Sequence, residues 1–156
     1  VGELLASSRL DFGQVNKRPL SVRDLASRAV ERAGLQPTAL AVLGEGDQVS
    51  ADPTLLQRAL ANLLDNAQKH GKGADALEVT VGADEVKFDV LDRGPGISGD
   101  GQQLFRKFNR GQNGDGADGL GLGLALVKRI ALVHGGQVWA VARDGGGARV
   151  GFSVKR

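Results

Sequence analysis

The sequence predicts an α+β domain in which a mixed β-sheet is covered on one face by helices. Three segments, around residues 22–33, 53–67 and 122–133, repeat apolar residues at the spacing of an amphipathic helix. Several shorter segments alternate apolar and polar residues, as half-buried strands do, and glycine-rich turns separate most of them. Because strands joined by short turns pair antiparallel, most of the sheet is expected to be antiparallel.

The first half of the chain carries clear signals for where its helices begin. In order, we expect the end of a helix (1–11), a short extended piece from Leu20, a helix (22–33), a strand (39–43) and a second helix from residue 53. Ser21 and Asp24 form a capping-box-like start, and Gly34 is a typical stop. Asp52 followed by Pro53 is typical of an N-cap and the first helical position.

The second half is organised around two glycine-containing turns. We expect paired strands (77–81 and 86–91), a mobile polar loop (111–119), a helix (122–133) and a hairpin of two strands (137–142 and 148–154). Residues 82–85 and 144–147 supply the turns. His134 is interpreted as a helix-end residue near the last helical carbonyls.

The composition fits one globular domain and excludes several classes of protein. The chain has 156 residues, of which 41% are hydrophobic. Its net charge of +2 is too small to indicate nucleic acid or a membrane surface as partner. The absence of Cys excludes disulfides, thiolate zinc sites and thiol catalysis. No apolar stretch approaches the roughly 20 residues of a membrane span, no signal peptide is seen, and the absence of Met indicates a piece of a longer protein.

Four polar residues share one sector of the second helix, beside its leucine face: Asn62, Asn66, Lys69 and His70. Amides are poor helix formers in mid-helix, so two of them four residues apart need a reason. A solvated stripe is one interpretation. A site for hydrated Mg²⁺ and phosphates is the other, because Asn oxygens are hard ligands and Lys69 adds a positive charge. The helix alone does not decide between them.

Asp92 directly follows a strand and opens the motif Asp-Arg-Gly-Pro-Gly-Ile, which ends at Ile97. In isolation this motif favours a plain turn. It also suits adenine, because a carboxylate can accept from an exocyclic amino group, and Gly94 and Gly96 would let a flat base approach the backbone.

Basic residues flank two phenylalanines before the polar loop. Phe105 and Phe108 can anchor one helical turn, which would leave Arg106, Lys107 and Arg110 at the root of the loop. Cations anchored there could face transferring phosphates. A short surface helix with ordinary charges is the simpler interpretation of this segment by itself.

Glycines alternate with leucines at the start of the third helix. Free N–H groups at such a start can face an anion, helped by the helix dipole. The dinucleotide fingerprint is excluded because it needs Gly at position 124, and no Walker A element occurs. The interleaved leucines argue against a flexible linker. The alternation consists of Gly119, Leu120, Gly121, Leu122, Gly123 and Leu124.

In this order and spacing, the four motifs resemble the N, G1, F and G2 boxes of sensor histidine kinases. More broadly, they resemble the ATP-binding domain that those kinases share with type II topoisomerases, heat-shock chaperones and mismatch-repair ATPases. The resemblance covers about residues 19–156, and residues 1–13 resemble the end of the preceding dimerisation helix. It implies a catalytic ATP-binding domain over 14–156 with a Bergerat-type fold, a two-layer α/β sandwich of a mixed five-stranded sheet and three helices.

The resemblance also implies a role for each matched residue. Asn66 would coordinate Mg²⁺ with help from Asn62, Asp92 would receive the adenine amino group, and residues 111–119 would form the ATP lid. The implied catalytic residues are Asn66, Lys69 and Arg110. The implied nucleotide-binding residues are Asn62, Asn66, Lys69, His70, Asp92, Gly94, Gly96, Ile97, Phe108, Arg110, Gly119, Leu120, Gly121, Leu122, Gly123 and Leu124.

A phosphoacceptor histidine is missing from the sequence. In the family, an acidic residue follows this His directly and a Pro follows soon after. Neither His70 nor His134 is followed by such residues. The resemblance therefore implies a cytoplasmic domain that binds ATP and Mg²⁺ and donates the γ-phosphoryl group to a histidine on a separate dimerisation domain. A response regulator would act downstream, and the parent protein would be anchored in the cell membrane. No contact of this domain with nucleic acid or membrane is expected.

The sequence leaves three alternatives. A conformational ATPase of the same superfamily is disfavoured, because Asn62 stands where such enzymes usually carry a Glu base. An anti-sigma-like serine kinase would share the boxes but normally lacks the leader seen at residues 4–11. The third is a non-catalytic nucleotide-binding or protein-binding module.

Overall fold

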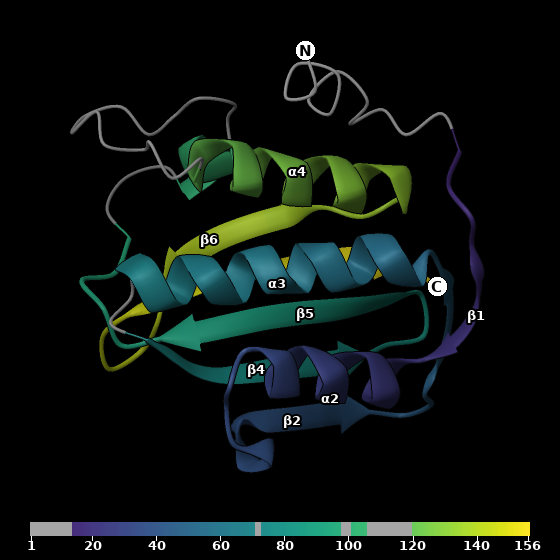
Figure 1. The fold of residues 1–156 in the computed structure, drawn as a ribbon, viewed down its shortest axis with the longest axis horizontal. Coiled ribbons are helices and arrows are strands. Elements are labelled where there is room, and N and C mark those ends of the chain that lie inside the picture. The colour runs from purple at the N-terminus through teal and green to yellow at the C-terminus, as the bar shows by residue number, and fades with distance from the viewer. Residues whose placement is uncertain (1–13, 71–72, 98–100, 106–119) are drawn as a thin grey trace.

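The protein has two layers, a β-sheet and three helices that cover one of its faces (Figure 1). The computed structural model describes residues 14–70, 73–97, 101–105 and 120–156. The helices are α2 (Val22–Arg32), α3 (Pro53–His70) and α4 (Leu120–Val133), with short 3-10 turns η2 (Pro37–Ala39) and η3 (Gly101–Phe105). The strands are β1 (Arg18–Ser21), β2 (Leu40–Gly44), β3 (Gln48–Ala51), β4 (Ala74–Val81), β5 (Glu85–Asp92), β6 (Val138–Ala142) and β7 (Ala148–Lys155).

The main sheet has five strands in the order β2-β4-β5-β7-β6. β2 runs parallel to β4, and the remaining neighbours are antiparallel. The predicted α/β sandwich, with a mixed five-stranded sheet under three helices, is therefore confirmed. Its core lies between the two layers, where Phe88 of β5 stacks on Phe152 of β7 with ring centroids 5.0 Å apart.

A second, two-stranded sheet was not expected from the sequence. β1 pairs antiparallel with β3, which places Leu20 opposite Val49. We expected an extended piece at Leu20 but no strand over residues 48–51. β3 has only four residues, and such a short segment carries little pattern of its own, so its pairing with β1 fixes it.

Local capping signals fix where two of the helices begin. The Ser21 side chain accepts a hydrogen bond from the Asp24 N–H at the start of α2. At the start of α3, Asp52 Oδ1 accepts from the N–H groups of Thr54 (3.0 Å) and Leu55 (3.2 Å). Both predicted helix starts are confirmed, because these side chains satisfy N–H groups that have no partner within the helix.

His134, directly after α4, joins the end of that helix to the beginning of α3. Its buried ring lies with Nδ1 2.8 Å from the Ile130 carbonyl oxygen, while Nε2 accepts from the Asp52 N–H at 3.1 Å. The ring can make both bonds only as the neutral Nδ1–H tautomer. Burial lowers the pKa of His134 below its usual value of 6.5. This histidine therefore has a structural role at the helix end.

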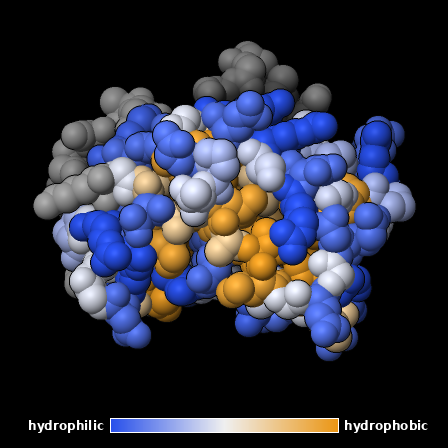
Figure 2. Space-filling model, turned by 90° about the horizontal axis from the view of Figure 1, so that it is seen from below, coloured by the Kyte–Doolittle hydropathy of each residue, from blue (hydrophilic) through white to orange (hydrophobic). Residues whose placement is uncertain are grey.

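The two edges of the main sheet differ. η3 covers the β6 edge, where Gln102 Nε2 donates to the Val138 carbonyl at 2.9 Å. β2 forms the opposite edge, and apolar side chains gather on the surface seen from that side (Figure 2). Leu43 of β2 is 48% exposed.

Among the helices that the structure describes, none combines the length and apolarity needed to span a lipid bilayer.

Candidate functional site

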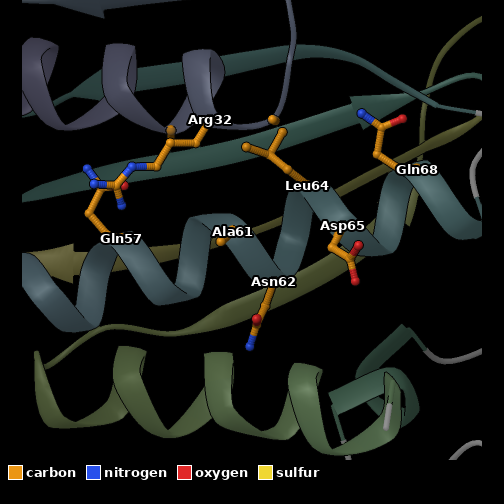
Figure 3. A pocket seen from close by; sticks show the side chains of 9 residues that line it. Arg32, Gln57, Ala61, Asn62, Leu64, Asp65 and Gln68 are labelled. Carbon is orange, nitrogen blue, oxygen red and sulfur yellow. The ribbon is translucent and has the colours of Figure 1, made fainter. Parts of the chain in front are cut away.

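Three elements that carry predicted site residues meet at one end of the molecule. The C-terminal ends of α3 and β5 and the first turn of α4 lie at the left of Figure 1. Asn62 of α3 points toward α4 (Figure 3), and its Nδ2 donates to the Gly123 carbonyl at 3.0 Å. The helix that carries the amides and the segment of alternating glycines and leucines are therefore in direct contact.

Asp92, the last residue of β5, is buried, unlike the predicted site residues Asn66 and Lys69 on α3. The residue is 5% exposed. Oδ1 accepts from the N–H groups of Gly94 (2.9 Å) and Ala148 (3.1 Å). In the described part of the chain no donor reaches Oδ2. The fold therefore fixes one carboxylate oxygen and leaves the other available to a ligand that donates a hydrogen bond.

The turn between β6 and β7 packs closely behind Asp92. Gly147 has a φ of 100°, in the left-handed region that favours glycine. A Cβ added there would collide with the Asp92 carbonyl oxygen. Gly96, with a φ of 88°, packs in turn against the Gly147 carbonyl, which would lie 3.2 Å from an added Cβ. Glycines in both segments thus let the loop after Asp92 and this hairpin turn approach each other.

Two charged residues that sequence reasoning missed also lie beside Asp92. Arg143 Nη1 donates to the Asp92 carbonyl oxygen at 3.1 Å, and its Nη2 lies 2.8 Å from Asp75 Oδ2. Arg143 and Asp92 are 51 positions apart, so no local spacing could have indicated the contact.

The helix side of the candidate site is more open. Asn66 lies one turn after Asn62 and is half-buried; within the described ranges its side chain makes no hydrogen bond. Lys69 is 44% exposed and forms an ion pair with Asp65 at 3.3 Å. Asn62 was expected to assist at a metal, and the structure gives its Nδ2 a contact with Gly123 that the sequence did not indicate.

The third helix begins two residues earlier than expected, at Leu120 instead of residue 122. Gly121, which was expected to precede the helix, therefore belongs to its first turn, together with Gly123. The first four N–H groups of a helix have no partner within the helix, and the helix dipole favours negative charge there. The start of α4 is consequently suited to an anion.

Several predicted site residues lie outside the described residues: Phe108, Arg110, Gly119, the lid at 111–119 and the leader at 1–13, as do the side chains of His70, Leu120 and Leu122. Their roles stay predictions.

A separate hollow of about 560 Å³ lies along α3 on the side of α2 (Figure 3). Its lining includes Arg32, Gln57, Asp65 and Gln68 and shares only Asn62 with the predicted site. Because Asp92 does not line it, we assign the candidate site to the end of the sheet and not to this hollow.

The described residues offer few side chains that could ligate a metal ion. In the described ranges, no group of three His, Cys, Asp or Glu side chains could hold a metal ion. The half-buried Asn66 amide, which has no protein partner there, fits a hard cation that takes its remaining oxygens from phosphate and water.

Residues 51–156 match the family described as histidine kinase-, DNA gyrase B- and HSP90-like ATPases. The chain belongs to this family.

Relatives and solved structures narrow the comparison to histidine kinases. The chain is 35% identical to the signal transduction histidine-protein kinase/phosphatase MprB of Mycobacterium tuberculosis, over 99% of this chain and 32% of the relative. It is 36% identical to the sensor protein KdpD of Escherichia coli, over 95% of this chain and 17% of the relative. The chain thus spans about a third or less of the length of these curated relatives.

The fold agrees with this grouping. The structure of a mycobacterial sensor histidine kinase MprB superposes with a TM-score of 0.68 at 26% identity, covering 89% of this chain and 97% of that one. The ATP-binding domain of PrrB from Mycobacterium tuberculosis gives 0.65 at 27%, covering 90% and 97%. The expected histidine-kinase-type ATP-binding catalytic domain is confirmed, and the alternatives are not favoured.

Proposed function

We propose that this domain binds ATP together with Mg²⁺ and donates the γ-phosphoryl group to a histidine on a separate dimerisation domain of its parent protein. Family membership and the histidine kinases among its relatives support the reaction class. The observation that carries the proposal is the buried Asp92 carboxylate, with one oxygen held by backbone amides and the other available, beside the ends of α3 and α4.

The sheet side would bind the base. Asp92 Oδ2 would accept a hydrogen bond from the exocyclic amino group of adenine. This hydrogen bond would be strong because a carboxylate is a charged acceptor. Gly94, Gly96 and Ile97 follow in the loop, where small residues would let the base lie against the backbone.

The helix side would hold the phosphates. Lys69 would contribute a positive charge, and the N–H groups at the start of α4 would face phosphate oxygens. Asn66 is the residue that would hold Mg²⁺, which when bound neutralises phosphate charge. Arg110 and Gly119 are proposed to complete this side.

Transfer would then depend on positioning. The acceptor imidazole nitrogen would attack the γ-phosphorus, the bond to the bridging oxygen would break, and ADP would leave. We further propose that a response regulator takes the phosphoryl group from that histidine and that the domain works in the cytoplasm.

The test mixes this protein with the purified dimerisation domain of its parent and ATP labelled at the γ-phosphate. Label should appear on that domain in an acid-labile, alkali-stable form, as expected for phosphohistidine. Acid-stable label would instead indicate a serine kinase. ATP binding without transfer would leave only a nucleotide-binding module, and absence of ATP binding would contradict the proposal as a whole.

A further inference from the structure

We propose that Arg143 is a positioning residue that aligns Asp92 and thereby sets the preference of the site for adenine. The inference rests on the proposed function in one respect, the assignment of adenine binding to Asp92. It assigns to Arg143 no contact with the nucleotide.

Arg143 joins three strands behind the candidate site. It follows the last residue of β6, and its side chain is only 16% exposed. The guanidinium donates through Nη1 to the Asp92 carbonyl of β5, and through Nη2 it pairs with Asp75 of β4. Its own N–H donates to the Gly147 carbonyl at 3.0 Å, so the same residue also closes the hairpin turn.

A bulge in β4 places Asp75 within reach of Arg143. Ala74 pairs with Asp92, but Ala76 pairs with Leu91, so Asp75 is an extra residue opposite a single step of β5. Bulges redirect side chains and are over-represented next to active sites. Here the extra residue supplies the carboxylate that holds Arg143 against the end of β5.

Asp92 is therefore held from two sides. Backbone amides of Gly94 and Ala148 fix its Oδ1, and Arg143 fixes its main-chain carbonyl. Loss of the guanidinium would remove the charged donor from the Asp92 carbonyl, at a residue that is only 5% exposed. Asp75, which is 40% exposed, would keep only its longer ion pair with Arg93 (3.6 Å). The end of β5 would then shift, and with it the direction of Oδ2.

Such a shift predicts a base-specific defect. ATP donates its 6-amino group to Asp92 in the proposed site, whereas inosine triphosphate carries a carbonyl oxygen at that position. Misalignment of Oδ2 should weaken ATP binding and leave inosine triphosphate, which has no such donor, nearly unaffected. General destabilisation of the domain would weaken the binding of both nucleotides to a similar extent.

The experiment measures the dissociation constants of ATP and inosine triphosphate, with Mg²⁺, for the native protein and Arg143→Gln by calorimetry. We expect about a tenfold loss for ATP, as for the loss of a charge-assisted hydrogen bond, and less than about a twofold loss for inosine triphosphate. Arg149→Gln is the matched control. Arg149, on β7, also forms ion pairs, with Glu78 (3.0 Å) and Asp89 (3.3 Å), but among the described residues no hydrogen bond or ion pair joins it to Asp92.

A second pair of variants keeps the inference falsifiable if Arg143→Gln folds poorly. Asp75→Asn should shift the nucleotide preference in the same direction by a smaller factor, and Arg143→Lys should retain part of the preference. An unchanged ratio of the two constants in these variants, or equal losses for both nucleotides, would overturn the role of Arg143 alone. A native protein that binds ATP without preferring it would refute the assignment of Asp92, and one that binds neither nucleotide would refute the proposed function as well.

Discussion

The sheet side and the helix side of the candidate site are built differently. On the sheet side, Asp92 is 5% exposed and its groups are bonded to Gly94, Ala148 and Arg143. On the helix side, Lys69 is 44% exposed, and Asn66 makes no side-chain hydrogen bond in the described part of the chain. The geometry on the sheet side, proposed to bind the base, is thus fixed by the fold, whereas the geometry on the helix side, proposed to bind the phosphates, is left more open.

This difference has a physical origin. Buried carboxylates are usually hydrogen-bonded, and on the sheet side the loop after β5 and the first residue of β7 supply the N–H groups that bind Asp92 Oδ1. Side chains on an exposed helix face carry no such requirement, because water satisfies them. The effects of substitutions on ATP affinity should therefore differ between the two sides, both in size and in their dependence on Mg²⁺.

The largest effect is expected from Asp92→Asn. The added amide N–H₂ would face the adenine amino group in place of an acceptor, so ATP affinity should fall by about 100-fold, while Oδ1 can still accept from the loop. Calorimetry gives the affinity and thermal unfolding the stability. Asp89→Asn is the control: it replaces another buried carboxylate of β5, which is bonded to Trp139 and Arg149 instead. Equal losses in both variants would contradict the distinction between the two carboxylates.

A smaller effect, conditional on the cation, is expected from Asn66→Ala. ATP affinity should fall by about tenfold in the presence of Mg²⁺ and stay unchanged in a chelator, because the side chain acts only through the metal. Titrations with and without Mg²⁺ measure both values. Gln68→Ala, on the same helix but lining the hollow beside α2, should change neither. If Asn66→Ala binds like the native protein in both conditions, the magnesium assignment is wrong.

The smallest effect on nucleotide binding is expected from a substitution of His134, which lies at the other end of the helices. Its expected effect is on the pH dependence of stability. Because burial lowers its pKa, the unfolded chain binds the additional proton as the pH falls below about 6.5, and the free energy of unfolding should decrease. One proton limits this slope to about 1.4 kcal/mol per pH unit. Urea unfolding at several pH values should show a weaker dependence for His134→Gln than for the native protein. Equal dependence would contradict a neutral structural imidazole.

Much of the fold could be predicted because its signals are local. Asp52 with Pro53 and Ser21 with Asp24 mark helix starts by chemistry confined to a single turn. The strands around residues 82–85 and 144–147 follow from alternation and glycine-rich turns. The order of four motifs then indicated the family, and residues as distant as Asn62 and Gly123 do meet.

What could not be predicted depends on contacts between distant segments. β3 becomes a strand because β1 pairs with it, and nothing in residues 48–51 alone requires that. The bulge at Asp75 and its ion pair with Arg143 arise only when β4, β5 and β6 lie together. A single charged residue in a sequence does not indicate its partner.

Position 147 shows how the end of β5 constrains the hairpin turn that packs behind it. Gly145 and Gly146 form the tip of this hairpin, and an added Cβ at Gly146 would meet open space, so that only its φ of 105° favours glycine there. At Gly147 even a methyl group would clash with the backbone at the end of β5. Natural variation and engineered insertions in this hairpin should therefore be confined to its tip.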